Sequence, residues 1–168
     1  MLFNSLTFIV FFAIVLFLHN LPFYWRTKKF NLLVASYLFY SAWNPPFVIL
    51  VWLSTIVDWN LAKRLFTETN QRKRKLLLLA SIIVNLGILA FFKYGDFLLQ
   101  NWQALMSLVG VEYQVPEWSI ILPVGISFYT FQTMAYTLDV YLKRAEPAKN
   151  FLDFALFVTF FPQLVAGP

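Results

Sequence analysis

Stretches of predominantly apolar residues, separated by short polar breaks, run along almost the whole chain. Because about 20 apolar residues cross a bilayer as a helix, each stretch is a candidate membrane segment. The pattern predicts six: residues 2–18, 30–43, 47–61, 76–92, 120–142 and one that begins near 151. A mixed pattern near 95–108 predicts an amphipathic helix at the membrane interface. The expected fold is an all-α, polytopic transmembrane helix bundle.

The breaks between segments add detail to this expectation. The second segment is short for a bilayer core about 30 Å thick, so we expect it to use its flanking residues or to be shielded by protein. Asn44-Pro45-Pro46 follows it. Neither proline can donate a backbone hydrogen bond, and each disfavours helix in the residue before it. The sequence therefore predicts a tight turn here.

Basic residues mark one side of the predicted membrane. If the N-terminus is extracytoplasmic, the cytoplasmic loops are 19–29, 63–75 and 143–150, which hold three, six and three Lys/Arg, or 12 of the 13 in the chain. Lys93 is the remaining one. Because basic loops stay in the cytoplasm, the asymmetry predicts a multi-pass protein of the cell membrane with its N-terminus outside.

Composition agrees with a membrane protein. Hydrophobic residues make up 60% of the chain and charged residues 12%, with a mean hydropathy of +0.67. Too few charges are present to cover the surface in water, so lipid is expected to be the solvent for much of the chain. We interpret the net charge of +5 as basic residues that face the cytoplasm, and nothing in the sequence points to a nucleic-acid partner. The absence of cysteine excludes disulfides and thiolate metal sites.

Polar side chains at membrane depth are the first candidates for function. Ser54, Thr55 and Asp58 share one face of the third segment. An ionisable residue in the membrane is costly unless it faces protein or water, which makes Asp58 a functional candidate. The alternative is that Asp58 lies at the interface and pairs with Lys63 or with a neighbouring loop.

The fifth segment carries two polar stripes. Ser127, Thr130, Thr133 and Thr137 form a stripe of hydroxyl groups, and Gln132 and Asp139 form a second one beside Tyr129 and Tyr136. A helix that faces lipid would not carry both, so this helix is expected inside the bundle. The stripes are interpreted as the wall of a passage, although hydroxyl groups also promote close helix packing. The passage candidates are Ser127, Tyr129, Thr130, Gln132, Asp139 and Gln163.

Proline and glycine interrupt the last two segments. Pro123 and Gly125 predict an irregular start to the fifth, and Pro162, Gly167 and Pro168 predict the same for the sixth. Irregular backbone at membrane depth is tolerated where protein or a water-filled cavity supplies hydrogen-bond partners.

These motifs resemble a known family. Residues 122–132 (LPVGISFYTFQ) and 160–168 (FFPQLVAGP), with 41–45 (SAWNP) and 54–58 (STIVD), are similar in order and spacing to the core of the membrane-bound O-acyltransferases, in the bacterial alginate O-acetyltransferase branch. The resemblance implies transfer of an acyl group, mainly acetyl, to hydroxyls of an extracytoplasmic polysaccharide. It also implies acetyl-CoA or another acyl thioester as cytoplasmic donor, no bound cofactor, and an extracytoplasmic acetylation partner protein.

The resemblance also implies a catalytic histidine, which this chain does not supply at a matching place. His19 is the single histidine and has no serine, cysteine or carboxylate close by in the sequence. We expect it to be an interfacial bystander, with no catalytic residue and no metal site within the chain. Residues 1–168 are therefore expected to be the N-terminal part of one acyltransferase domain that continues beyond Pro168. A membrane transporter and a non-catalytic assembly subunit are the alternatives.

Overall fold

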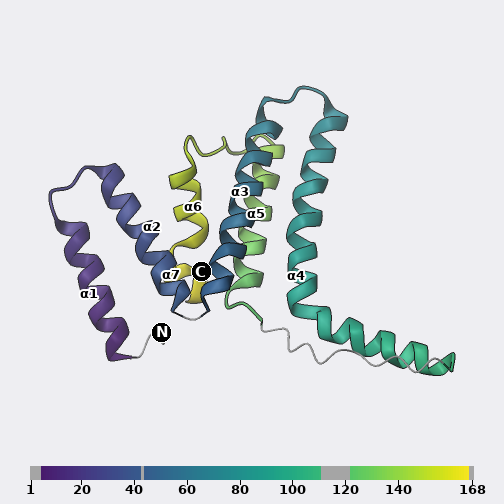
Figure 1. Cartoon of the computed structure of the whole chain (residues 1–168). Coiled ribbons are helices and arrows are strands. Elements are labelled where there is room, and N and C mark those ends of the chain that lie inside the picture. The colour runs from purple at the N-terminus through teal and green to yellow at the C-terminus, as the bar shows by residue number, and fades with distance from the viewer. Residues whose placement is uncertain (1–4, 43, 111–121, 167–168) are drawn as a thin grey trace.

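The computed structural model describes residues 5–42, 44–110 and 122–166. Within these ranges the chain is helical and contains no strand. Figure 1 shows the helices, which are α1 Leu6–Asn20, α2 Trp25–Ser41, α3 Pro45–Thr67, α4 Gln71–Leu108, α5 Ile126–Tyr141, α6 Phe151–Thr159 and α7 Phe161–Ala166. The expectation of an all-α bundle is confirmed.

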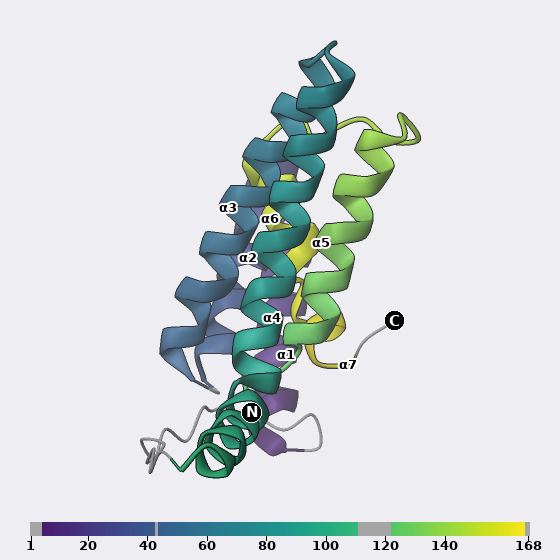
Figure 2. The same ribbon diagram turned by 90° about the vertical axis from the view of Figure 1, so that its right-hand side faces the viewer.

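Helix α3 stands at the centre of the bundle. It packs against α2 and α6 on one side and against α4 and α5 on the other, as Figure 2 shows from the α4 and α5 side. Helix α1 lies at the edge, against α2. The three loops that join α1 to α2, α3 to α4 and α5 to α6 all lie at one end of the bundle in Figure 1. This end, which carries the predicted cytoplasmic loops, is called the basic end below.

Several helix boundaries differ from the sequence prediction. Helix α2 begins at Trp25 rather than at residue 30, which lengthens the short second segment to 17 residues. Pro45 and Pro46 do not form a turn but open α3, after the N-cap residue Asn44. Proline is well suited to the first helical turn, because the N–H it lacks would have no partner there.

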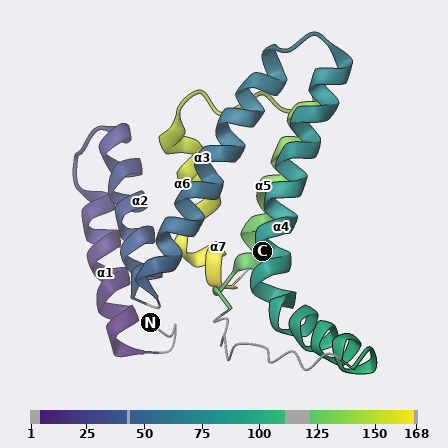
Figure 3. The ribbon, with the colours of Figure 1, turned by 45° about the vertical axis from the view of Figure 1, so that its right-hand side comes forward.

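The fourth segment and the predicted interfacial helix belong to a single helix. Helix α4 runs for 38 residues, and its C-terminal part bends away from the bundle, as Figures 1 and 3 show. Its N-terminus is capped by Asn70, whose side chain accepts hydrogen bonds from the N–H groups of Arg72 and Lys73. The predicted start of the fifth segment at residue 120 lies outside the described residues.

Glycine and proline shape the last three helices. Gly125 precedes α5 with a φ of +75°, a left-handed conformation that glycine adopts without steric cost. Helix α6 ends at Thr159 and α7 begins at Phe161, with Pro162 as its second residue. Because proline cannot donate to the carbonyl four residues before it, the α6 ladder cannot continue through this point. The Phe161 N–H donates instead to the Ser36 hydroxyl on α2, at 3.2 Å. Gly167 and Pro168 lie outside the described residues.

The distribution of polar and apolar side chains is that of a membrane protein. Helices α3 and α4 are long and apolar enough to cross a bilayer, and shorter apolar helices span Leu6–Asn20 and Phe151–Gln163. Large apolar side chains such as Ile49, Leu76 and Ile83 are exposed, whereas Asp58 and Asn85 are buried. In water this arrangement would be costly, whereas lipid solvates the apolar surface. The protein is therefore a helical membrane protein.

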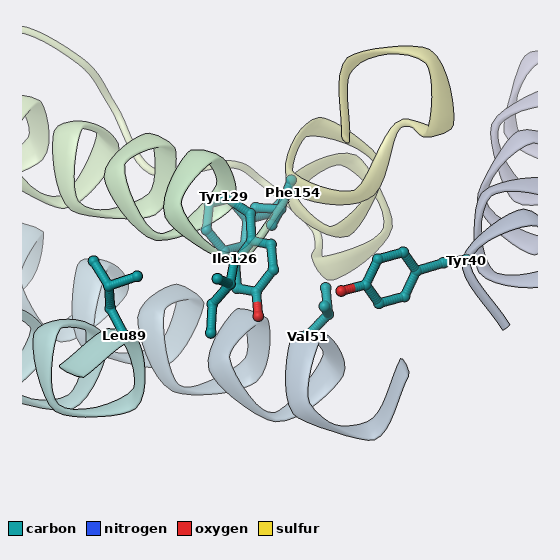
Figure 4. Close-up of a cluster of buried hydrophobic side chains, with 7 residues drawn as sticks. Tyr40, Val51, Leu89, Ile126, Tyr129 and Phe154 are labelled. Atoms are coloured by element: carbon teal, nitrogen blue, oxygen red, sulfur yellow. The ribbon is translucent and has the colours of Figure 1, made fainter. Parts of the chain in front are cut away.

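The apolar core lies where five helices meet. It is formed by Tyr40, Val51, Leu89, Ile126, Tyr129, Phe154 and Val158, which come from α2 to α6. Figure 4 shows the ring of Tyr129 directed from α5 toward α3 and α4, beside Ile126. The Tyr40 hydroxyl donates to the Val124 carbonyl at 2.9 Å and so ties α2 to the chain just before α5.

A second cluster of aromatic rings joins the ends of the described chain. Phe161 of α7 is buried, and its ring meets those of Phe11 and Phe39 at centroid distances of 5.4 and 5.5 Å. Rings at these separations pack favourably beyond the area that they bury. This cluster holds α1 and α2 against α7, the short helix that follows the break after α6.

We expect Phe161→Ala to lower the free energy of unfolding by about 3 kcal/mol, because it removes a fully buried ring and leaves a cavity. Phe131→Ala is the matched control, since the Phe131 ring on α5 is exposed. Both variants would be unfolded by titration with a denaturing detergent in mixed micelles and followed by tryptophan fluorescence. Equal loss of stability in the two would contradict the assigned role of the cluster.

Candidate functional site

A group of buried polar side chains joins α3, α4 and α5. It consists of Asp58, Ser81, Asn85, Thr133 and Thr137, which we call the polar cluster. All five are almost completely buried. Buried polar groups are costly unless they are hydrogen-bonded, so the partners of each decide what the cluster can do.

Asp58 is the acceptor at the centre of the polar cluster. Its Oδ1 accepts from the Ser81 hydroxyl at 2.7 Å and from Asn85 Nδ2 at 2.9 Å, and its Oδ2 lies 2.9 Å from the same Nδ2. The carboxyl group is thus bound by two residues of α4, one turn apart. No cation pairs with Asp58 among the described residues.

Asn85 has a partner for each of its donors and for its acceptor oxygen. An amide carries two N–H donors and one acceptor oxygen. The donors serve the Asp58 carboxyl group and the Ser81 backbone carbonyl, the latter at 3.0 Å. The Oδ1 atom accepts from the Thr133 hydroxyl of α5 at 3.1 Å. Asn85 is therefore the residue through which α3, α4 and α5 are connected.

The hydroxyl stripe of α5 faces this cluster, as expected of a helix inside the bundle. Thr130, Thr133 and Thr137 are buried, and the Thr133 and Thr137 hydroxyls lie 3.1 and 3.0 Å from backbone carbonyls of their own helix. Ser127 is only partly buried and has no hydrogen bond to the cluster within the described residues. The arrangement satisfies its polar groups internally and joins the three helices.

The suggested pairing of Asp58 with Lys63 is wrong. Lys63 Nζ lies 4.1 Å above the Trp59 ring instead, an attraction between a cation and an aromatic face. Asp58 points the other way, into the bundle. The residues that the sequence analysis missed are Ser81 and Asn85. Their spacing of four puts two polar side chains on one face of an apolar segment, which is a signal that could have found them.

The second polar stripe of α5 faces α6. Gln132 Nε2 donates to the Phe157 carbonyl at 2.9 Å, while its Oε1 is buried without a hydrogen-bond partner among the described residues. The hydroxyl of Tyr129, three residues earlier, is also buried and without a partner there. Two unsatisfied polar atoms therefore lie on neighbouring turns of one helix.

The remaining passage candidates are not joined to this pair. Asp139 is partly buried near the end of α5, where its carbonyl accepts from the Arg144 N–H at 2.9 Å. Gln163 lies in α7, and its N–H donates to the Phe160 carbonyl at 3.0 Å. No hydrogen bond connects the side chain of Ser127, Asp139 or Gln163 to Tyr129 or Gln132 in the part of the chain that the structure describes.

His19 lies apart from both stripes. It is in the last turn of α1, and its ring meets the edge of Trp25 with centroids 6.2 Å apart. Among the described residues, no three side chains of His, Cys, Asp or Glu come together as a metal site would require. Nothing in this geometry pairs His19 with a nucleophile.

The fold and its polar interior define a helical membrane protein. The sequence of the chain is also similar to those of several known proteins. The chain is 37% identical over 146 residues to a probable alginate O-acetylase, AlgI, of Pseudomonas syringae and to one of Azotobacter vinelandii. It is 32% identical over 164 residues to a peptidoglycan O-acetyltransferase of Helicobacter pylori. These matches cover 83–85% of this chain.

The matches confirm the resemblance to the polysaccharide O-acetylating branch of the membrane-bound O-acyltransferases. The matched regions make up 28–30% of the relatives' lengths. No protein-family model matches the chain, and no solved structure matches it.

We expect Asn85→Ala to lower the free energy of unfolding by about 2–4 kcal/mol, because it removes the amide donor of the Asp58 carboxyl group and the bond from Thr133 to α4. This exceeds the roughly 0.6 kcal/mol that an average hydrogen bond between membrane helices contributes. The loss would be measured by thermal unfolding in detergent.

Asn101→Ala is the matched control for this variant. Asn101 lies on the exposed C-terminal part of α4, and its side chain bonds only within that helix, to the Phe97 carbonyl at 2.7 Å. A loss of stability no larger than that of the control would show that Asn85 does not join the three helices.

Proposed function

We propose that this protein is an O-acetyltransferase that acts on a polysaccharide from within the membrane. The observation that carries the proposal is the similarity, over 83–85% of the chain, to proteins named as alginate O-acetylases and a peptidoglycan O-acetyltransferase. The substrates named for these relatives are both polymers that carry sugar hydroxyls, which makes such a hydroxyl the proposed acceptor. The membrane bundle and its polar interior fit this reaction.

The proposed orientation places the basic end in the cytoplasm and the N-terminus outside. The three loops with most of the positive charge lie together at one end of the bundle in Figure 1, which supports a multi-pass arrangement. Because such loops are retained in the cytoplasm, the acyl donor, acetyl-CoA or another acyl thioester, would approach this end. The polysaccharide and an extracytoplasmic partner protein would meet the opposite end.

Helix α5 is the proposed wall of the passage between the two sides. Its hydroxyl face is bound to α3 and α4. Tyr129 Oη, on a ring directed toward α3 and α4, and Gln132 Oε1, on the side of α6, have no hydrogen-bond partner among the described residues. Leaving a polar atom buried and unbonded costs about 1–3 kcal/mol, so a passing substrate or water would gain by contact with these atoms. The catalytic histidine that the family resemblance implies stays a prediction.

The activity is tested with membranes from cells that express the full-length protein. With acetyl-labelled acetyl-CoA and alginate as acceptor, we expect labelled O-acetyl esters that are lost on mild alkaline treatment. Gln132→Leu should lower this transfer at least about tenfold with an unchanged melting temperature, because it removes the amide from the passage.

His19→Ala is the control for the activity test. It should retain transfer within about threefold, since a positioned general base contributes on the order of 10²-fold or more. Absence of ester formation in the wild type, with alginate and with peptidoglycan, would reject the proposed reaction. Equal loss of folded protein and of activity in Gln132→Leu would reject the passage role alone.

The orientation is tested with single cysteines, which the chain lacks in its natural form. Thr69→Cys and Lys149→Cys at the basic end should react with a membrane-impermeant maleimide only after the cytoplasmic side is opened. Val109→Cys, exposed near the end of α4, should react in intact cells because it lies outside. The reverse pattern of labelling would show that the basic end is extracytoplasmic.

A further inference from the structure

A cavity of about 680 Å³ opens at the basic end, between the α3–α4 loop and the end of α5. Its wall includes Glu68 and Thr69 of the loop, Arg74 in the first turns of α4, and Tyr141 and Lys143 at the end of α5. The cavity is separate from the polar cluster and from the Tyr129–Gln132 pair. Its charged residues point to a ligand of a particular kind.

Arg74 is the unusual residue of this wall, because only 5% of it is exposed. Its Nη2 donates to the Tyr141 backbone carbonyl, and its guanidinium carbon lies 5.4 Å from the centre of the Tyr141 ring. Its Nε is buried without a hydrogen-bond partner among the described residues. Among the described residues, an ion pair forms between Lys29 and Asp153, and none involves Arg74. The Arg74 guanidinium therefore has no carboxylate partner among them.

Glu68 lies on the same wall but is bound elsewhere. Its Oε1 accepts from the backbone N–H groups of Thr69 and Asn70 at 3.0 and 2.9 Å. The Asn70 bond, with lesser contributions from Lys73 and Thr69, holds the pKa of this carboxyl below its usual range. The carboxylate is therefore used to shape the α3–α4 loop, and it does not form a salt bridge with Arg74.

The start of α4 adds further positive charge. Arg72, Lys73, Arg74 and Lys75 follow one another in its first turns, and the first turn holds no acidic residue. The N-terminus of a helix already carries the positive end of the helix dipole, which favours anions and disfavours cations. A buried guanidinium in this field is costly unless an anion compensates it.

Lys143 brings a further positive charge to the cavity. Among the described residues other than glycine, Lys143 alone has a positive φ, which is 59°. The left-handed residue closes the C-terminus of α5, where the Arg144 N–H donates to the Asp139 carbonyl at 2.9 Å. Lys143 thereby follows the C-cap residue Leu142 in the cavity wall. The cavity thus combines a buried arginine, a nearby lysine and a basic helix start.

We propose that this cavity binds a phosphate group, with Arg74 as the buried donor and Lys143 as a second cation. Arginine suits a phosphate because its planar fork matches two phosphate oxygens. The phosphate would belong either to the headgroup of an anionic lipid or to a soluble phosphate ester. The wall of this cavity contains neither Tyr129 nor Gln132, so the site can be tested separately from the proposed passage.

The test is thermal unfolding of the full-length protein in detergent micelles, followed by tryptophan fluorescence. One series adds phosphatidylglycerol and compares it with phosphatidylcholine, and a second adds inorganic phosphate against sodium chloride of equal ionic strength. A ligand that binds only the folded state raises the melting temperature. A shift with phosphatidylglycerol alone identifies a lipid site, and a shift with inorganic phosphate identifies a site for soluble phosphate. No shift in either series overturns the proposal.

The role of Arg74 is tested by Arg74→Gln with Arg72→Gln as the matched control, because Arg72 is exposed on the same turn. Loss of a charge-assisted bond to phosphate should weaken apparent binding by about tenfold or more in Arg74→Gln, and by less than about threefold in the control. Equal binding by Arg74→Gln and wild type overturns the proposal.

A second variant keeps the test decisive if Arg74→Gln does not fold. Lys143→Asn removes the positive charge while keeping a residue that tolerates a positive φ, so the backbone is not disturbed. We expect the ligand-induced shift to fall at least by half. An unchanged shift in Lys143→Asn, with Arg74→Gln unfolded, overturns the site as proposed.

Discussion

The structure depends on the requirement that a polar group buried among membrane helices must be hydrogen-bonded by protein. Asp58 imposes this requirement most strongly, because its carboxyl group lies at the centre of the bundle. Ser81 and Asn85 meet it from α4, and Thr133 completes the connection from α5. Since lipid offers little hydrophobic drive for helices to associate, these directional bonds select which helices pack together.

That selection gives α5 two different environments. Its threonine face is fixed to α3 and α4, whereas the stripe with Tyr129 and Gln132 turns toward the apolar core and α6. The first face is satisfied and rigid. The second retains polar atoms without partners among the described residues, and this is why it is the proposed wall of the passage. One helix thereby serves both stability and the proposed passage, and the two roles are separated by its faces.

The basic end follows a different physical rule. In the proposed orientation this end reaches the headgroup region, where charges can be solvated by water and headgroups. Basic side chains that are exposed there would need no partner within the protein. Arg74 is the exception, since it is buried against Tyr141 and its charge is not compensated by a carboxylate among the described residues. It therefore requires an explanation that the exposed cations do not.

The sequence by itself determined the membrane solvent, the helical class, the clustering of positive charge and the burial of α5. These properties follow from composition and periodicity, because lipid and the helical repeat act on each segment independently. It also determined the interruption at Pro162, since the missing N–H of proline is a local property. The extension of α2 to Trp25 was not local, because Lys29 in this added turn forms an ion pair with Asp153 of α6. The continuity of α4 through its exposed C-terminal part has no explanation in packing, because that part bends away from the bundle.

Only the tertiary structure decided which groups the buried polar side chains bond to. Asp58 had Lys63 close in sequence, yet it bonds to Asn85, which is 27 residues away, while Lys63 lies over Trp59. Gln132 and Arg74 likewise found their partners on other helices, at the Phe157 and Tyr141 carbonyls. The physical reason is that a polar side chain in a membrane needs a partner at hydrogen-bond distance. Periodicity gives the face on which a residue lies, and the packing of separate helices alone decides what stands opposite it.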